Sequence, residues 1–306
     1  MLLNYDTTVL PRVRMMGRVR YHEPWCHFSR VIDEYILYVI RDGDMYLEEN
    51  GVRMHLKAGD FLLLEPNLPH AGYKAASCDY YYAHFKHDRM SRALDDEQAV
   101  ESMKETRRKS MIGYNLDEID PTDPVIGIPK RFNVSALEYR QMLHAAVEAY
   151  DRREEQYKRY VSTQLHLFLM MVAHEFLTAE CAKEDTKRKK SEVAVDSLIR
   201  YLNAHYTENI TSDQISERFE MNFDYLNRVF SSVTGSTIFY YINMLRISNA
   251  KQLITTTNLT FAEVAYLVGV EDRYYFTRLF KRYVGMTPTD YYRAAHTLPS
   301  KEGETV

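Results

Sequence analysis

Short apolar and aromatic segments alternate with turn residues from residue 35 to residue 85. The apolar segments are residues 35–40, 45–47, 54–56, 61–64 and 79–85. The turn signals between them are Asp42-Gly43-Asp44, Glu49-Asn50-Gly51, Ala58-Gly59-Asp60 and Pro66-Asn67-Leu68-Pro69. Segments of this kind, spaced about 8 to 12 residues apart, are typical of a β-sandwich or β-barrel. The pattern predicts an all-β N-terminal domain, which we place at residues 1–130.

A helical pattern follows over residues 131–182. Ser135 and Glu138 form a capping box, in which each side chain binds an unpaired backbone N–H at the start of a helix. A second helix is indicated by apolar residues at spacings of three and four, which lie on one face: Val161, Leu165, Phe168, Val172 and Phe176, widened by Leu167, Leu169, Met170 and Met171. We expect this helical pair to clasp the barrel or to contact a second subunit, as a dimerisation element.

Two charged stretches interrupt these patterns. Residues 87–123 have little periodicity and are predicted to be an irregular excursion of the first domain. Residues 183–191 are nearly all charged or polar and cannot bury apolar surface, so they are read as an interdomain linker or as a solvated extension of the preceding helix. Residues 192–295 then form a C-terminal domain, and residues 296–306 a tail.

An internal repeat dominates the C-terminal domain. The sequence of residues 225–237 recurs, in pattern, at residues 275–287, an offset of 50 residues. A shorter segment precedes each copy, opened by Thr211 and by Thr260, both suited to cap a helix. Each copy therefore predicts helix, tight turn, helix. In the second turn Gly269 tolerates a left-handed backbone, whereas the first copy has Glu220.

A long amphipathic helix is predicted between the two copies. Its apolar positions are Ile238, Tyr241, Ile242, Leu245, Ala250, Leu253 and Ile254. The fold class that follows is multidomain: an N-terminal all-β barrel, a helical connector, and a C-terminal all-α domain with two helix-turn-helix motifs joined by a linker helix.

Composition narrows the class of protein. The chain has 306 residues, 45% hydrophobic and 27% charged, which suits a soluble protein with two cores. No apolar run approaches the ~18 residues that span a bilayer, and the N-terminus lacks the order of a signal peptide, so we expect a cytoplasmic protein without membrane contact. Cys26, Cys78 and Cys181 have no CxxC spacing, which argues against a disulfide framework or a cysteine zinc site.

Charge bears on DNA binding. The net charge is −4, and residues 191–293 contain 10 Lys and Arg against 11 Asp and Glu. Contact with DNA must therefore come from local clusters of cations, and non-specific affinity is expected to be modest. Dimerisation or a well-matched site would compensate for it.

One run of residues in the second copy is highly distinctive. It comprises Ala265, Val268, Gly269, Tyr275, Phe276, Arg278, Phe280, Lys281, Gly285, Thr287, Pro288, Tyr292 and Arg293. This run resembles the signature of the AraC/XylS family of transcription regulators, and the resemblance covers about the last hundred residues. It implies that the second helix of each motif enters a major groove of double-stranded DNA. It also implies that the protein forms a homodimer and contacts RNA polymerase.

The resemblance also implies DNA-contacting residues. They are Asp224, Asn227 and Arg228 in the first motif, and Arg273, Tyr274, Thr277, Arg278 and Lys281 in the second. Arg and Asn suit bidentate contacts with guanine and adenine, while Lys281 suits a phosphate. Asp224 can only accept hydrogen bonds, so it either selects cytosine or points away from the DNA. For Arg228 and Arg278 the alternative role is a salt bridge within the domain.

The N-terminal part shows a looser resemblance. In residues 43–85 the arrangement of Gly51, Gly59-Asp60, Pro66 and Pro69-His70 resembles the cupin-like sensor domain of the sugar-responsive branch of the same family. In a strand, Tyr80, Tyr82 and His84 share one face, which would suit a polar ligand. The resemblance implies ligand contacts from Arg30, Tyr80 and Tyr82, with Trp25 as a neighbour. It also implies an effector that is a sugar or related metabolite. The alternative role of the tyrosines is ordinary packing inside the barrel.

Alternative functions remain at this stage. A metal-dependent cupin enzyme fused to a DNA-binding domain would need an HxH pair, but His22, His27, His55, His70 and His84 are scattered, with His70 expected in a loop. We therefore expect no metal, no cofactor and no enzyme activity. A DNA-repair methyl acceptor would need reactive cysteines in zinc-like spacing, and a protein-binding helix-turn-helix module is favoured only by the balanced charge.

Overall fold

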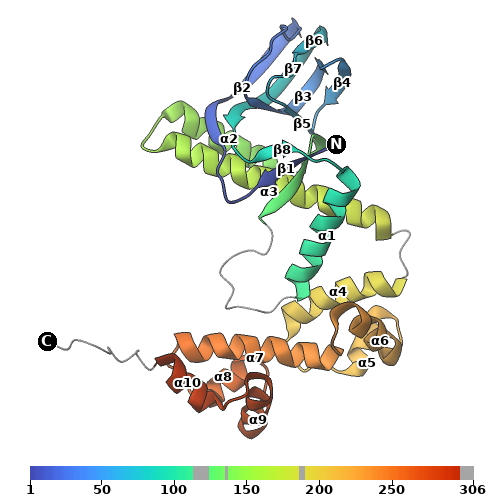
Figure 1. Ribbon diagram of the computed structural model, residues 1–306, viewed down its shortest axis with the longest axis vertical. Coiled ribbons are helices and arrows are strands. Elements are labelled where there is room, and N and C mark those ends of the chain that lie inside the picture. The colour runs from blue at the N-terminus through green and yellow to red at the C-terminus, as the bar shows by residue number, and fades with distance from the viewer. Residues whose placement is uncertain (113–123, 135–136, 186–189, 297–306) are drawn as a thin grey trace, which may run out of the picture. The chain divides into compact units, whose positions relative to one another are not determined.

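The computed structural model describes residues 1–112, 124–134, 137–185 and 190–296. The chain divides into two compact units, of which the first contains residues 1–106 and 122–183 and the second contains residues 107–121 and 184–306. The first unit holds all the strands of the described residues, and the second is helical (Figure 1).

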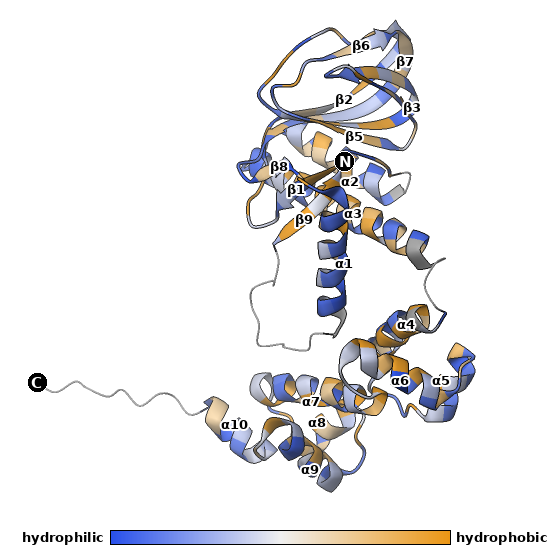
Figure 2. Ribbon diagram, turned by 45° about the vertical axis from the view of Figure 1, so that its right-hand side comes forward, coloured by the Kyte–Doolittle hydropathy of each residue, from blue (hydrophilic) through white to orange (hydrophobic). Residues whose placement is uncertain are grey.

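The strands of the first unit form two antiparallel sheets. They are β1 (Leu2–Asp6), β2 (Arg12–Trp25), β3 (Tyr35–Glu49), β4 (Val52–Lys57), β5 (Asp60–Leu64), β6 (His70–Lys74), β7 (Ala76–Lys86), β8 (Met90–Arg92), β9 (Val125–Pro129) and β10 (Arg131–Asn133). The larger sheet has the order β10-β5-β3-β7-β2, with β4 and β6 paired to β3, and it curls into a barrel (Figure 2). The smaller sheet has the order β8-β1-β9, so the N-terminal strand is its centre. The predicted N-terminal β-barrel is confirmed, although the unit that contains it also includes helices.

Both faces of β5, of most of β7 and of the first part of β3 are buried, which explains why these segments read as continuous apolar runs. Because successive side chains of a strand point to opposite faces, β3, β5 and β7 contribute to two cores. One core faces the helices and includes Leu37, Val39, Phe61, Leu63, Tyr81, Ala83 and Phe85. The other fills the barrel interior and includes Ile36, Tyr38, Ile40, Leu62, Leu64 and Tyr80, with Tyr82 packed against it.

Helices α2 (Leu137–Arg152) and α3 (Tyr157–Asp185) lie across one side of the barrel (Figure 1). The predicted stripe of α3 is the face that packs there: Val161, Leu165, Phe168 and Val172 are fully buried, and the Phe168 ring lies 6.0 Å from that of Phe61. By length and composition alone, Tyr157–Lys183 could cross a membrane. The sequence analysis did not predict such a segment, because polar residues interrupt its apolar runs. Its apolar stripe is instead part of the barrel-side core.

Two expectations about segments of the first domain need correction. Residues 87–123 contain β8 and helix α1 (Asp96–Ile112), which begins where the Asp95 carboxylate accepts from the N–H groups of Glu97 and Gln98. The helix is almost wholly hydrophilic (Figure 2), so its sequence lacks the apolar periodicity from which a helix is predicted. Residues 113–123 lie outside the described part. The first domain also extends past residue 130, because β10 pairs with β5.

Two further predictions fall partly on residues that are not described. Of the capping box, Ser135 lies outside the described residues, and α2 begins at Leu137. Of the predicted linker, residues 186–189 lie outside them; α3 continues to Asp185, and α4 begins at Lys190, so both ends of this stretch are helical.

The second unit consists of two helix-turn-helix motifs and a shared helix. The helices are α4 (Lys190–His205), α5 (Ser212–Phe219), α6 (Phe223–Thr234), α7 (Ile238–Thr256), α8 (Phe261–Leu267), α9 (Arg273–Val284) and α10 (Pro288–His296). The first half of α7 packs with α4, α5 and α6, and its second half packs with α8, α9 and α10, which gives two separate cores. Thr211 and Thr260 cap α5 and α8 in complete capping boxes, as expected.

The turns inside the two motifs have the same backbone conformation. Gly269 has φ of 77°, and Glu220, at the matching place, has φ of 51°. This left-handed conformation costs a residue with a side chain about 1–2 kcal/mol, whereas glycine adopts it without that cost. Glu220, where the first copy departs from the repeat, therefore has a strained backbone conformation.

Residues 206–208, in the loop that follows α4, contact both α7 and the turn of the second motif. The Arg246 guanidinium of α7 donates to the carbonyl oxygens of Tyr206 and Glu208, both at 2.8 Å. Gly269 packs so closely on Thr207 that an added Cβ atom would lie 2.2 Å from its carbonyl oxygen. Loop 206–208 is thus held between α7 and the second turn. Together with α7, it fixes the distance between the two motifs.

Candidate DNA interface and ligand site

Helix α9 presents a cationic and aromatic face. Its buried side is formed by Phe276, Leu279 and Phe280, which leaves the opposite side exposed. Arg273, Tyr274, Arg278 and Lys281 lie on the exposed side, and Tyr274 is 82% exposed. Thr277 is half-buried, and its hydroxyl donates to the carbonyl oxygen of Arg273 at 3.0 Å.

Asp272 sets the start of this helix. Its carboxylate accepts from the N–H groups of Tyr274 and Tyr275 at 2.6 and 2.9 Å, and these hydrogen bonds lower the pKa of Asp272. A capped N-terminus holds the first turn rigid, and the first turn is the part of a recognition helix that meets base edges. The sequence reasoning did not single out Asp272.

Helix α6 presents a smaller exposed face. Asp224 and Arg228 are exposed, and the Arg228 Nε lies 3.4 Å from the carbonyl oxygen of Asp224. Asn227 is half-buried, and its side-chain oxygen accepts from the N–H of Ile238 at 2.9 Å. This hydrogen bond fixes the Asn227 amide against the start of α7, so one half of it already has a structural partner.

The arginine and lysine side chains on the exposed faces of α6 and α9 form no salt bridge with the described residues. Among the described residues, neither Arg228, Arg273, Arg278 nor Lys281 lies within 4.0 Å of a carboxylate oxygen. Their charges are therefore available to an external anion such as a phosphate, or to the acceptor groups of a base.

In the first unit, Arg30 joins a cluster of neutral polar groups at the barrel interior. Its Nε donates to His70 Nε2 at 3.0 Å, and its Nη2 lies 3.4 Å from the Tyr38 hydroxyl and 3.5 Å from His84 Nε2. His27 Nε2 lies 3.0 Å from the same Tyr38 hydroxyl. Residues from the β2–β3 connection, β3, β6 and β7 thus meet at one place.

The predicted ligand residues lie partly in this cluster. Tyr80, Tyr82 and His84 share one face of β7 as expected, with ring centroids 6.4 and 6.0 Å apart in succession. Trp25 lies beside the cluster rather than in it, stacked on Tyr21 at 4.4 Å and edge-on to His27 at 5.4 Å.

Sequence reasoning missed three members of the cluster. His70 was expected in a loop, but it is the first residue of β6 and is 3% exposed. Tyr38 could have been found from the alternation of β3, because it follows Ile36 on the interior face. Nothing local to His27 signals its position, since contacts across the barrel bring it to Tyr38.

Glu34 is the acidic group beside the cluster, and it already has partners. Arg14 Nε donates to one carboxylate oxygen at 2.6 Å, and His84 Nδ1 lies 3.2 Å from the other. Burial raises the pKa of Glu34, but the contacts with Arg14 and His84 outweigh it, so the pKa is lowered. Glu34 is therefore ionised at neutral pH and neutralised by Arg14.

The cluster does not suit a metal ion. Within the described residues, no group of three or more His, Cys, Asp or Glu side chains is placed to hold one. The Arg30 guanidinium lies between His70 and His84, where it would repel a cation.

Burial depresses the pKa of two cluster histidines, and this makes the stability of the barrel sensitive to pH. The pKa of His27 and that of His84 are both lowered to about 4, mainly by desolvation and further by the charge of Arg30. Between pH 6.5 and 4 the unfolded chain binds more protons than the folded chain, so the free energy of unfolding falls as the pH drops. We expect a loss of about 2 kcal/mol for each histidine between pH 7 and pH 5.

Urea unfolding followed by the fluorescence of Trp25, the chain's single tryptophan, measures this effect, because Trp25 lies next to His27. His84→Gln should reduce the pH dependence. A free energy of unfolding that is unchanged between pH 7 and pH 5 would contradict the neutral state of these histidines.

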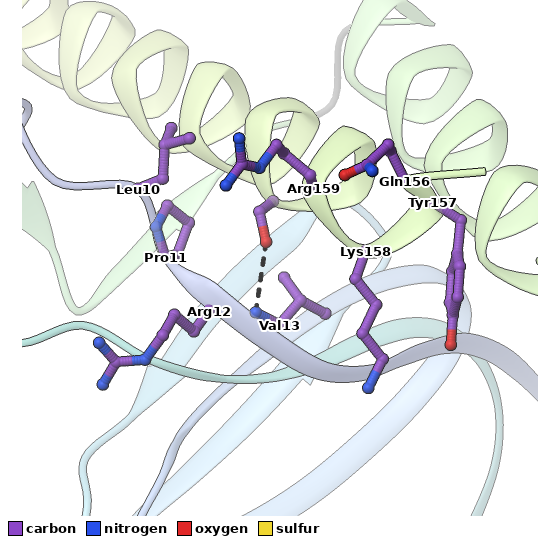
Figure 3. A pocket seen from close by; sticks show the side chains of 9 residues that line it. Leu10, Pro11, Arg12, Val13, Gln156, Tyr157, Lys158 and Arg159 are labelled. Carbon is purple, nitrogen blue, oxygen red and sulfur yellow. Dashed lines mark hydrogen bonds between the residues drawn. The ribbon is translucent and has the colours of Figure 1, made fainter.

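A separate groove lies on the outer surface of the same unit. It has a volume of about 760 Å³ and runs between residues 10–13 and the start of α3, where Lys158 and Arg159 line it (Figure 3). The Ser162 hydroxyl in its floor accepts from the N–H of Val13 at 3.4 Å. The groove is open and its charged side chains are exposed, so it is a surface feature and not an enclosed ligand site.

Models of known protein families match both the helix-turn-helix region and the barrel region of the chain. A family model described as a helix-turn-helix domain matches residues 215–294, and a model described as an AraC-like ligand binding domain matches residues 18–119. The chain combines an AraC-type helix-turn-helix domain with an AraC-like ligand-binding domain. It is a DNA-binding transcription regulator with an N-terminal ligand-binding domain.

Individual relatives cover the chain to different extents. An HTH-type transcriptional regulator of Bacillus subtilis, YisR, is 27% identical over 87% of this chain and 88% of its own length. The HTH-type transcriptional activator RhaR of an Enterobacter species is 32% identical over 36% of this chain and 39% of its own length. Among solved structures, the DNA-binding domain of AdpA in complex with a target DNA is 25% identical over 33% of this chain and 95% of that chain, with a TM-score of 0.32.

Proposed function

We propose that this AraC-family protein acts in the cytoplasm as a homodimer whose two helix-turn-helix motifs read adjacent major-groove segments, under the control of a small polar effector bound in the barrel. The observation that carries the DNA-binding part is the exposed face of α9, where Arg273, Tyr274 and Arg278 project beside a capped first turn. The observation that carries the sensor part is the polar cluster around Arg30.

Each DNA-facing residue has a role that suits its chemistry. Arg228 and Arg278 suit guanine, to which a guanidinium donates two hydrogen bonds, and Asp224 suits the amino group of cytosine. Asn227 offers its amide nitrogen, because its oxygen is bound to Ile238. Arg273, Tyr274 and Thr277 approach the bases from the first turns of α9, and Lys281, one turn further along, suits a phosphate.

A second apolar stripe of α3 supports the homodimer. Tyr160, Leu167 and Met170 are 48%, 46% and 38% exposed and recur at spacings of seven and three, so they share a face of the helix that the barrel does not cover. A second copy of α3 would bury this stripe. The near-balanced charge of the C-terminal domain favours the same assembly, because two domains on one DNA double the number of contacts.

Effector control follows if the ligand binds two arrangements of the dimer with different affinities. The shift it produces cannot exceed that difference in affinity. Contact with RNA polymerase would then convert altered DNA binding into altered transcription.

Variants of α9 separate base reading from phosphate binding. Arg278→Ala is expected to weaken binding to the preferred site by about 1–3 kcal/mol, or roughly 5- to 150-fold, and to relax the preference at one base pair. Lys281→Ala is expected to weaken binding to all sequences alike and to reduce the salt dependence by about one counterion. Fluorescence anisotropy with site and non-site duplexes over a salt series measures both. If Arg278→Ala affected both duplexes equally, the proposed base contact would be wrong.

A further inference from the structure

Arg30 is a half-buried cation at the barrel interior, and among the described residues no carboxylate pairs with it. Every carboxylate that the described residues bury in the first unit has a cationic partner other than Arg30. The pairs are Asp6 with Arg89, Glu34 with Arg14, Glu49 with Lys130, Asp60 with Arg131, and Asp79 with Arg18 and Arg41. Arg30 contacts only imidazole, phenol and phenyl groups. Arg30 is half-buried, and the groups that surround its guanidinium offer no negative charge, so an anion would find an uncompensated cation here.

Two of the three polar side-chain contacts of Arg30 are weak enough to be exchanged for contacts with that anion. The hydrogen bond to His70 is of ordinary length, at 3.0 Å, but the contacts of Nη2 with Tyr38 and His84, at 3.4 and 3.5 Å, are long and therefore weak. A guanidinium binds a carboxylate more strongly than neutral acceptors, through two parallel short hydrogen bonds. An anion could replace the two long contacts while His70 keeps the side chain in place.

The surrounding groups are neutral and able to bind hydroxyl groups. His27, His70 and His84 have lowered pKa values because they are buried, and the charge of Arg30 lowers them further, so each is uncharged at pH 7. A neutral imidazole has one donor and one acceptor nitrogen. Tyr80 and Tyr82 line the same face, and within the described residues no hydrogen bond occupies their hydroxyl groups.

We propose that the effector is a small hydroxylated acid, whose carboxylate binds Arg30 and whose hydroxyl groups bind the histidines and tyrosines of the barrel. This inference rests on the proposed sensor function, and it narrows the sugar or related metabolite that the resemblance suggested to one that carries a carboxylate. A neutral sugar would satisfy the hydroxyl-binding groups but would leave the Arg30 charge uncompensated.

Matched pairs of acid and neutral compound test the charge requirement. We would measure the melting temperature of the full-length protein with galacturonate against galactose, gluconate against glucose, and lactate against glycerol, at one ionic strength set with sodium chloride. At least one acid is expected to raise the melting temperature in a saturable manner, while its neutral partner does not. If no acid did so, or if a neutral compound did so equally well, the inference would be overturned.

Substitution of Arg30 assigns the effect to the barrel. Arg30→Gln should weaken binding of the acid at least tenfold, and Arg30→Lys, which keeps the charge without the bidentate fork, should weaken it less. Arg12→Gln is the matched control, because Arg12 is an exposed arginine of the same unit that pairs with Asp88. Melting of each variant without ligand shows whether it folds. Unchanged binding in folded Arg30→Gln would overturn the inference.

DNA binding measured with the same compounds separates this inference from the proposed function. A neutral sugar that stabilises the protein and changes its affinity for DNA would leave the sensor function standing and would refute the acid. An acid that binds through Arg30 but leaves DNA affinity unchanged would support the ligand class and would refute the sensor function.

Discussion

Gly269→Ala is expected to abolish site-specific DNA binding and to destabilise the C-terminal domain by about 3 kcal/mol or more. Two effects add here. Alanine is strained at a φ of 77°, and its Cβ atom would lie 2.2 Å from the carbonyl oxygen of Thr207 and 2.6 Å from its carbonyl carbon. Relief of this clash must move the second turn away from loop 206–208. The distance between the two motifs, which α7 and this loop set, would then change.

Circular dichroism on heating and anisotropy with a site duplex measure the two parts of this prediction. Glu220→Gly is the matched change in the first motif, where the same backbone conformation already carries a side chain. It is expected to stabilise the domain by roughly 0.5–1 kcal/mol and to leave DNA binding intact. Wild-type stability and affinity in Gly269→Ala would show that loop 206–208 does not control the arrangement of the motifs.

Lys130→Met is expected to destabilise the N-terminal unit by about 3–5 kcal/mol, because it leaves buried carboxylates without their main cation. The Lys130 ammonium, 11% exposed, lies between the carboxylates of Glu49 and Glu65. Arg92 then remains as the partner of Glu65 at 2.8 Å. The backbone of Lys130 also binds that of Met1 and of Leu63, so the site joins the N-terminal strand to the barrel.

Urea unfolding followed by Trp25 fluorescence measures this loss. The double variant Lys130→Met, Glu49→Gln is the control, since it removes a negative charge together with the positive one and retains an acceptor for the Glu65 N–H. It should recover a large part of the lost stability. Equal instability of the single and double variants would mean that packing, and not the unpaired charge, causes the effect.

The elements that could be predicted from the sequence are those with local signals. The two helix-turn-helix motifs depend on contacts within about 25 residues, and their caps at Thr211 and Thr260 and the turn at Gly269 can be read directly. The β3 to β7 region was predictable because turn residues separate its strands, and the alternation of Tyr80, Tyr82 and His84 follows from strand geometry.

The missed elements depend on distant partners or carry no apolar pattern. Strand β1 pairs with β8 and β9, which lie about ninety and more than a hundred and twenty residues away, so nothing in residues 2–6 alone identifies it. Helix α1 is too polar to show a helical period. The Arg30 cluster likewise depends on the approach of His70 from β6 to the β2–β3 connection.

Selection of binding sites from a random pool of double-stranded DNA, with full-length protein over a salt series, tests the central claim most directly. The account predicts enrichment of a site with two contacted segments about one helical turn, or roughly 34 Å, apart in each half. Enrichment should be lost in the double variant Arg228→Ala, Arg278→Ala, which is expected to stay folded because both side chains are exposed. Absence of any enriched sequence at low salt, or its persistence in the double variant, would contradict the account.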